Sequence, residues 1–336
     1  MENKISNRVT LKKKNKIFWI DDDNKRETAA INLSYQLKLN YLFRNFRNKN
    51  FLGDLHDYLK EAKNCQLIVI DHRLDKIKDK DIINGPSVAE IFRQKLPGLP
   101  IISITAIDIV NIDTHAKNVY DEIISGSRIG ENTLKIAALV KGYQKIRRRI
   151  PKNERQLLKI LNSPKADDDM LISIIPDVIK MGKITRESIK KISDWIRKVL
   201  MAKPGFLIDK LWAATYCGIK FDSFSKIELK FKEDIYDGVF SNKTDIRWWK
   251  SKLISKIFVL NPTYKSIYPW EAARVFQEIN KNDFSLCGYC NQEYPEIVGF
   301  TDNEAKTPIQ LHQHCSIPHP KFEKSLFFEE IRIIKD

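Results

Sequence analysis

Polar side chains follow three short apolar runs in the N-terminal part of this 336-residue sequence. The run IFWI leads into Asp21 and Asp22, the run LIVI leads into Asp71, and the run IISI leads into Thr105. If the runs are parallel strands of one sheet, their carboxyl ends lie at the same edge and these side chains converge. Three carboxylates in one place repel each other and favour a divalent cation, and oxygen ligands suit Mg²⁺.

A phosphoryl group is the natural reactant for such a site. A cation beside a carboxylate neutralises an incoming phosphoryl group, as an acyl phosphate on Asp71 requires. The hydroxyl of Thr105 is then placed to hydrogen-bond a phosphoryl oxygen. We therefore expect Mg²⁺ to bind Asp21, Asp22 and Asp71. The alternative is that these aspartates are solvated strand ends without a ligand.

A second cluster of metal-binding residue types lies near the C-terminus. Cys287 and Cys290 form a CxxC pair, and His312 and Cys315 repeat the same two-residue gap. Four nitrogen and sulfur ligands suit a tetrahedral structural Zn²⁺. His314 is the alternative to His312 as the imidazole ligand. The spacing predicts a small zinc module that is similar to a treble clef.

The aspartates need a sheet to position them, and residues 16–145 have the pattern of one. Short apolar runs alternate with amphipathic stretches, and the runs lack strict apolar–polar alternation. This is typical of a parallel sheet covered by helices on both faces. We predict an α/β, doubly wound (βα)5 domain. Its strands are expected at 16–20, 37–43, 65–70, 100–106 and 119–126, and its helices at 24–37, 51–62, 86–96 and 131–149.

The runs IFWIDDD, IVIDHRL, NGPSVAEIFRQKLPGLP and IISITA, in this order and spacing, resemble the receiver domain of two-component response regulators over residues 14–148. The resemblance implies that Asp71 is the phosphoacceptor and Thr105 the switch residue. It also implies that Asp21 and Asp22 hold Mg²⁺ and that the partner is a sensor kinase.

One element of the receiver pattern is missing. Receivers carry a lysine after the fifth strand that pairs with the phosphate, whereas the corresponding stretch DEIISGSRIG has Ser125 and Gly126 there. Arg128 lies nearby, but a guanidinium on a different backbone position does not reproduce a lysine point charge. The sequence therefore leaves open a pseudo-receiver that docks a protein partner without being phosphorylated.

The charge of the chain is concentrated in its middle. The net charge of +15 divides into +5 for residues 1–140, +14 for 141–270 and −4 for 271–336. A basic middle segment favours a polyanionic partner, DNA or RNA. Trp248 and Trp249 beside cationic residues can form a stacking platform, or they can belong to the core. The candidate nucleic-acid contacts are Arg147, Arg148, Arg149, Arg247, Trp248 and Lys250.

The sequence beyond residue 148 predicts two further domains. Residues 149–270 are expected to form a basic, mainly helical α+β region, and residues 271–336 the zinc module. Helices are expected at 152–162, 168–181, 185–202, 206–218, 244–260 and 269–280, and a strand at 226–234.

Composition bounds the class of protein. Five cysteines, an odd number, and a charged N-terminus without a signal peptide argue against a disulfide-rich secreted protein. No apolar run approaches the roughly 20 residues of a membrane helix. We expect a cytoplasmic signalling protein that is not an enzyme, in which the receiver-like domain controls the basic and zinc-containing region. One alternative is an adaptor that docks a protein partner. The other is a nucleic-acid-cleaving effector, for whose catalysis the zinc module has only His314 and His319 left over beyond its ligands.

Overall fold

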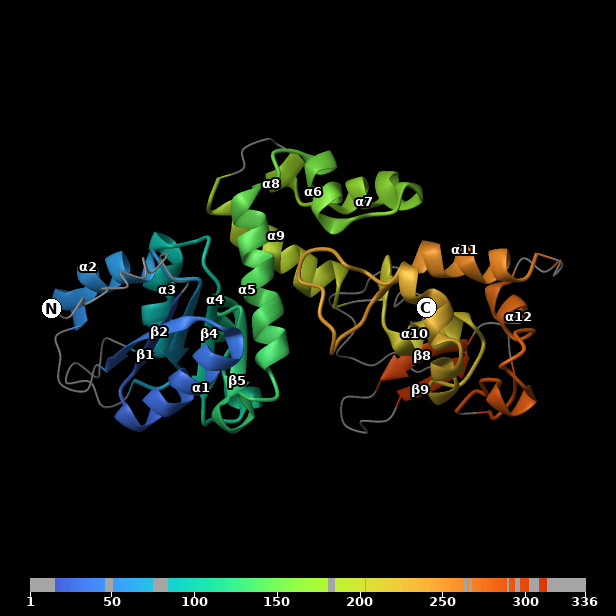
Figure 1. Cartoon of the computed structure of the whole chain (residues 1–336), viewed down its shortest axis with the longest axis horizontal. Coiled ribbons are helices and arrows are strands. Elements are labelled where there is room, and N and C mark those ends of the chain that lie inside the picture. Colours follow the sequence, from blue (N-terminus) through green and yellow to red (C-terminus); the bar gives the residue numbers. More distant parts are fainter. Residues whose placement is uncertain are drawn as a thin grey trace, which may run out of the picture. The chain divides into compact units, whose positions relative to one another are not determined.

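Two compact units make up the chain in a computed structural model (Figure 1). The first unit combines Met1–Arg148 with Thr185–Lys190, and the second combines Arg149–Ile184 with Lys191–Asp336. The predicted division between residues 270 and 271 stays a prediction. The structure describes residues 16–45, 51–74, 84–180, 185–202, 204–262, 265, 268–288, 290–293, 297–301 and 308–312.

A five-stranded parallel sheet forms the centre of the first unit. Its strand order is β2-β1-β3-β4-β5, so the chain winds outward in both directions from β1 and β3. This is the doubly wound topology that the alternating pattern predicts. The strands are β1 Lys16–Asp21, β2 Asn40–Asn45, β3 Leu67–Asp71, β4 Ile101–Thr105 and β5 Glu122–Ser125.

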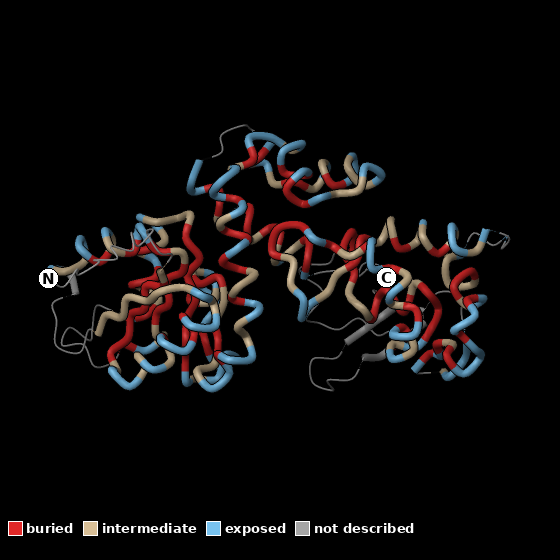
Figure 2. The backbone as a smooth tube through the Cα atoms, in the orientation of Figure 1, coloured by how far each residue is buried: buried red, intermediate tan, exposed pale blue. Residues whose placement is uncertain are grey.

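Helices cover both faces of this sheet. One face carries Phe18 and Ile20 of β1 and packs into a core with Val88, Ala89 and Phe92 of α3. On the other face α1 and α5 contact each other (Figure 1). Because both faces are covered, the central strands β1, β3 and β4 are almost fully buried and need no polar alternation, whereas the edge strands β2 and β5 are mostly half-buried (Figure 2). The helices are α1 Glu27–Leu37, α2 Phe51–Ala62, α3 Gly85–Lys95, α4 Thr114–Val119 and α5 Thr133–Arg148.

The register of the strands brings the predicted site residues to one edge. Asp71 lies beside Ile104, and Thr105 lies beside Ser125. Asp21 is the last residue of β1, one position beyond the pair Ile20 and Ile70. The carboxyl ends of β1, β3, β4 and β5 therefore finish within one residue of one another.

A buried carboxylate, Asp121, fixes the start of β5. It accepts hydrogen bonds from the Ile101 backbone N–H at 2.7 Å, from the Tyr143 hydroxyl at 2.5 Å and from Arg93 Nη2 at 2.7 Å. The ammonium of Lys190 lies 3.5 Å from its Oδ1. These contacts compensate a carboxylate whose side chain is fully buried. They also join the beginning of β4, α3, α5 and the returning segment of the chain.

The described residues of the second unit form short helices and two small antiparallel sheets. Its core contains Trp212, Phe224, Phe231, Trp248 and Phe276. Strands β6 Leu207–Ile208 and β7 Trp248–Trp249 pair with each other, as do β8 Ile297–Thr301 and β9 Pro308–His312. The helices are α6 Glu154–Leu161, α7 Asp168–Ile174, α8 Asp177–Lys180, α9 Ser188–Trp195 (which includes the boundary at residue 190), α10 Lys210–Tyr216, α11 Lys250–Leu260 and α12 Pro269–Ala273.

Two helices predicted in this unit start later than expected, because the residues before them form a sheet. The prediction of one helix over 206–218 is wrong at its start, because β6 occupies Leu207–Ile208. The helix begins after its N-cap Asp209, whose carboxylate accepts a hydrogen bond from the Trp212 N–H at 2.9 Å. The predicted N-cap Thr244 is also wrong, since β7 pairs with β6 and α11 begins only at Lys250. Strand pairing here outweighs the helical periodicity of the sequence.

Three further predictions need correction. The expected strand at 226–234 is instead a series of 3-10 turns, Glu228–Asp234. The expected helix at 168–181 is divided at Pro176 into α7 and α8, because proline lacks the N–H that a continuous helix needs. The helix expected over 269–280 ends at Ala273. Among the described residues, no helix is both long enough and apolar enough to cross a bilayer.

Candidate functional site

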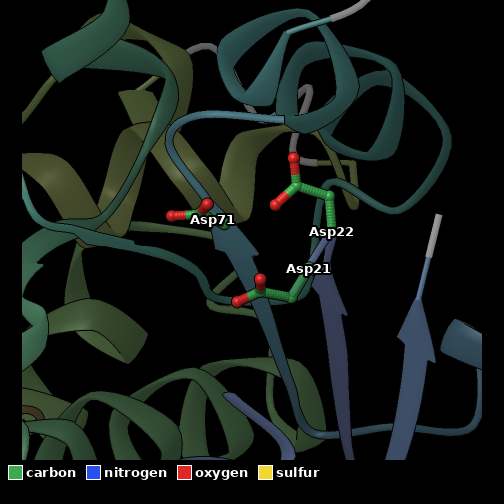
Figure 3. A group of neighbouring side chains, drawn as sticks. All are labelled: Asp21, Asp22 and Asp71. Carbon is green, nitrogen blue, oxygen red and sulfur yellow. The ribbon is translucent and has the colours of Figure 1, made fainter. Parts of the chain in front are cut away.

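Three carboxylates meet at the carboxyl edge of the parallel sheet. Asp21 and Asp22 follow β1, and Asp71 ends β3; each offers a carboxylate oxygen within 4.8 Å of the others. Figure 3 shows the three side chains around a common space beyond the two strands. Asp21 and Asp22 are buried, and Asp71 is partly exposed. The structure thus brings together the three residues predicted to bind Mg²⁺.

Local hydrogen bonds hold Asp21 in place. Its Oδ1 accepts from the Asp23 backbone N–H at 2.9 Å, and its Oδ2 accepts from the indole Nε1 of Trp19 at 3.3 Å. Trp19 is fully buried in β1, so the indole fixes the carboxylate relative to the sheet. One ligand atom of the cluster is therefore coupled directly to a tryptophan ring.

The backbone beside Asp71 is fixed by a close approach of α3. A Cβ atom at Gly85 would lie 2.3 Å from the carbonyl oxygen of Asp71 and 2.6 Å from that of His72. Only glycine fits between the helix and the strand end at this distance. Asn84 caps the helix by accepting from the Ser87 N–H at 2.9 Å. The run NGPSVAE therefore sets the position of the strand end from which Asp71 projects.

The electrostatics of the cluster favour a bound cation. Burial, together with the charges of Asp21 and Asp22, raises the pKa of Asp71 from 3.8 to about 7. Burial also raises the pKa of Asp21 to about 6, against the hydrogen bonds from Asp23 and Trp19. Clustered, poorly solvated carboxylates gain most from a divalent cation, because it removes their mutual repulsion. The residues present therefore fit Mg²⁺.

Thr105 lies at the same edge, one strand away from Asp71. Its side chain is buried, and its Oγ1 accepts a hydrogen bond from the Ile107 N–H at 3.0 Å. The hydroxyl proton is not used by this contact and can be donated to another acceptor. Thr105 therefore has the position and the donor that a phosphoryl oxygen on Asp71 would need.

The residue after β5 is a glycine that faces an arginine from the turn after β1, at the same carboxyl edge of the sheet. A Cβ atom at Gly126 would lie 2.8 Å from Nη1 and 3.3 Å from Nη2 of Arg26. The positive charge of Arg26 partly offsets the rise in the pKa of both Asp21 and Asp71. Arg128, the cation that the sequence places just after β5, is exposed. Sequence reasoning missed Arg26, since it belongs to the β1–α1 turn and no motif connects it with β5.

The predicted zinc ligands lie partly outside the described residues. Cys287 is buried and Cys290 partly buried, and His312 is the last residue of β9, whereas Cys315 and its neighbour His314 lie outside the described residues. The turn after Cys287 is fixed by hydrogen bonds from the Gly288 N–H to the Gln310 carbonyl and from the Asn291 N–H to the Cys287 carbonyl. The Cys287–Cys290 turn is therefore hydrogen-bonded to the strand that ends at His312.

The tryptophan pair is not a stacking platform for bases. Trp248 is 1% exposed and Trp249 is fully buried, so the prediction that Trp248 contacts nucleic acid is wrong.

Arg247 forms ion pairs with Asp209 at 3.5 Å and Asp245 at 2.9 Å. Lys250 lies over the ring of Tyr216, 5.8 Å from its centre. The three arginines at the end of α5 that are predicted to contact nucleic acid are exposed: Arg147, Arg148 and Arg149.

Comparison with known proteins gives structural neighbours only. No protein-family model and no curated protein matches the chain. A response regulator receiver domain protein (CheY-like) from Methanospirillum hungatei JF-1 is 17% identical; the match covers 39% of this chain and 97% of that chain, with a TM-score of 0.31. The signal receiver domain of an HD domain-containing protein from Pseudomonas fluorescens Pf-5 is 16% identical, with coverage of 43% and 98% and a TM-score of 0.33. The response regulator protein TrrA from Thermotoga maritima, in complex with Mg²⁺-BeF, is 21% identical, with coverage of 38% and 98% and a TM-score of 0.29.

Proposed function

We propose that the first unit is a receiver-type phosphoacceptor domain of a signalling regulator, with Asp71 as the acceptor. The observation that supports this proposal is the convergence of Asp21, Asp22 and Asp71 within 4.8 Å, with Thr105 on the neighbouring strand. Parallel α/β sheets bind their ligands at this edge. A fold alone does not establish a function, so the proposal rests on the chemistry of these four side chains.

Asp71 is the nucleophile in the proposed reaction. One of its carboxylate oxygens forms a bond to phosphorus while the bond from phosphorus to the donor, a phosphohistidine or an acyl phosphate, breaks. The bonding electron pair leaves with the donor nitrogen or oxygen. The Thr105 hydroxyl donates to a phosphoryl oxygen of the product. Mg²⁺, when bound by Asp21, Asp22 and Asp71, supplies positive charge that offsets the repulsion between the carboxylates and the phosphoryl group.

Trp19 provides the experiment that tests the proposal. Its indole donates to Asp21, so we expect its fluorescence to change when the cluster binds Mg²⁺ and again when a beryllium fluoride mimic of the phosphoryl group binds. Both ligands are titrated into the intact chain and into an Asp71→Asn variant. A saturable beryllium fluoride signal in the wild type and none in the variant is the expected result. An unchanged signal in the variant would contradict the proposal.

Two controls make the readout specific. Trp19→Phe removes the reporter, and the signal should disappear with it, because Trp19 is the tryptophan whose indole is hydrogen-bonded to a carboxylate of the cluster. Asp57→Asn removes an exposed carboxylate of α2 outside the cluster and should leave both titrations unchanged. Asp21→Asn with Asp22→Asn should abolish the Mg²⁺ response while the far-UV circular dichroism spectrum is retained.

The basic region 141–270, which begins within α5, is proposed to be the output of this regulator together with the zinc module. The exposed arginines at the end of α5, Arg147, Arg148 and Arg149, support contact with DNA or RNA, for which salt-dependent binding is the test. The competing proposal is an adaptor that docks a protein partner. A chain with an unchanged affinity for nucleic acid after replacement of all three arginines by glutamine would favour the adaptor.

A structural Zn²⁺ is proposed for Cys287, Cys290, His312 and Cys315. Its support is the turn between the two cysteines, which is hydrogen-bonded to β9, the strand that ends at His312. Asn291 has a φ of 56°, a left-handed conformation that closes the turn directly after Cys290. In this proposal the zinc holds the β8–β9 hairpin to the turn and takes no part in catalysis.

A further inference from the structure

We propose that Arg26 is the phosphate-binding cation of the aspartate cluster, and that Gly126 is the position that admits its guanidinium. The inference rests on the proposed phosphoacceptor function and adds a residue to it. Its starting point is the contact between the β1–α1 turn and the residue that follows β5.

The backbone around Arg26 is fixed by its neighbours. The carboxylate of Asp23 accepts from the Lys25 N–H at 3.0 Å, and the Arg26 N–H donates to the Asp23 carbonyl at 3.0 Å. These bonds form the 3-10 turn Asn24–Arg26, which Asp23 separates from Asp21 and Asp22. Arg26 itself is partly buried. Its side chain therefore leaves from a closed turn beside two of the three carboxylates.

The guanidinium crosses the edge of the sheet toward β5. Its Nη1 lies 2.8 Å and its Cζ 3.4 Å from the point where a Cβ of residue 126 would be. Gly126 follows Ser125, which is paired with Thr105 on β4. The cation thus lies next to the strand end that neighbours Thr105. A larger residue at 126 would occupy the same space, so glycine and arginine fit here as a pair.

Charge gives the arginine a role in this place. The strongest charges acting on Asp71 are those of Asp21, Asp22 and Arg26, and Arg26 is the positive one. A phosphoryl group on Asp71 adds negative charge to a cluster that already holds three carboxylates. A guanidinium presents several N–H donors in one plane and binds phosphoryl oxygens in pairs. Arg26 can therefore provide the charge and the donors that the stretch after β5 lacks.

The exposed Arg128 is the matched control for this proposal. It lies two residues beyond Gly126 in the same turn, and Arg128→Gln removes the same charge from that turn without touching the Arg26 contact. The experiment measures the affinity of the Mg²⁺-loaded chain for beryllium fluoride through Trp19 fluorescence. Arg26→Gln should weaken this affinity roughly 10- to 100-fold, the loss of one charge-assisted hydrogen bond. Arg128→Gln should leave it within about twofold, the range of a remote surface charge.

Variants at residue 126 test the pairing independently. Gly126→Val keeps every charge but fills the space of the guanidinium, and it should lower the affinity for beryllium fluoride as Arg26→Gln does. Gly126→Lys in the Arg26→Gln background places a cation directly after β5 and should restore binding. The affinity for Mg²⁺ alone separates the charge role from a loss of fold, because it should not fall in any of these variants.

The outcomes distinguish the two proposals. A wild-type chain without an Asp71-dependent beryllium fluoride response would overturn the phosphoacceptor function and the role of Arg26 together. A response that is lost in Asp71→Asn but kept in Arg26→Gln would overturn only the role of Arg26. A loss in Arg128→Gln equal to that in Arg26→Gln would also overturn it, since any local positive charge would then serve.

Discussion

The indole Nε1 of Trp19 donates a 3.3 Å hydrogen bond to Oδ2 of Asp21. A buried ring in the middle of the sheet is thereby joined to a carboxylate of the proposed metal cluster. We therefore expect a ligand that binds the carboxylates at the edge of the sheet to change the environment of Trp19, a fluorophore in the core.

The ionisation of Asp71 should make stability depend on pH. Its folded-state pKa of about 7 lies above the ordinary value of 3.8, so ionisation opposes folding. The native state holds more protons than the unfolded state between these values, and the free energy of unfolding falls as the pH rises through them. Without Mg²⁺, Asp71→Asn should therefore be more stable than the wild type at pH 8 by roughly 1–3 kcal/mol.

Urea denaturation at two pH values, in the presence of a chelator, measures this difference. At a pH of about 4 most of the advantage of Asp71→Asn should be lost, because the carboxyl group is then protonated in the folded state and about half protonated in the unfolded state. Saturating Mg²⁺ should reduce the advantage at pH 8. An Asn variant less stable than the wild type at pH 8 without metal would contradict the burial argument.

The hydroxyl of Thr105 should matter for the phosphoryl mimic and little for the fold. Thr105→Val keeps the shape of the side chain but loses the acceptor for the Ile107 N–H and the free hydroxyl proton. We expect the affinity for beryllium fluoride to fall about tenfold, as for one lost hydrogen bond. Thr105→Ser keeps the hydroxyl and should bind as the wild type does. Equal affinities of the valine and serine variants would refute the role of the hydroxyl.

The contacts of Asp121 should be a main source of stability in the first unit. Asp121→Ala leaves Arg93 and Lys190 without their buried partner, and we expect a loss of roughly 3–5 kcal/mol. Tyr143→Phe removes one hydrogen bond and should cost about 1 kcal/mol. Chemical denaturation measures both values. Tyr35→Phe, which alters an exposed ring, is the control and should have no effect.

Zinc content tests the second cluster. Metal analysis of freshly purified protein should find about one Zn²⁺ per chain, and Cys287→Ser or Cys315→Ser should lower it. Cys65→Ala serves as the control, because that buried thiol lies in the core of the first unit. Protein without zinc, or zinc retained in both serine variants, would exclude the proposed site.

The sequence predicted the five strands of the first unit because two independent signals agree there, whereas the helix α4 Thr114–Val119 was not predicted and reaches the start of the strand expected at 119–126. The strands are apolar on both faces, and each polar residue that matters comes at a strand end, where the topology of a parallel sheet determines its neighbours. Asp21, Asp71 and Thr105 could therefore be placed together before their contacts were known. Arg26 could not, because its partner Gly126 has no side chain and lies a hundred residues away in sequence.

The second unit was harder to predict because local pattern and tertiary pairing disagree. The stretch KIELKFKED alternates like a strand, yet Leu229 is 82% exposed while Ile227 and Phe231 are buried. A spacing of four residues between buried positions is that of a helical turn, and alternation hid it. Trp248 and Trp249 fit a helix by periodicity, but they pair with Leu207 and Ile208. Such distant pairing leaves no trace in a window of neighbouring residues.

The interaction of Lys190 with Asp121 can form only late in the translation of the chain. All five strands of the first unit have been translated by Ser125 and its last helix by Arg148, yet one charge partner of its buried carboxylate comes only at Lys190. The chain must therefore be translated through Lys190, and Lys190 must leave the ribosome, before this contact can form. Slow translation of that stretch would prolong the time during which the Asp121 carboxylate is paired with Arg93 but not yet with Lys190.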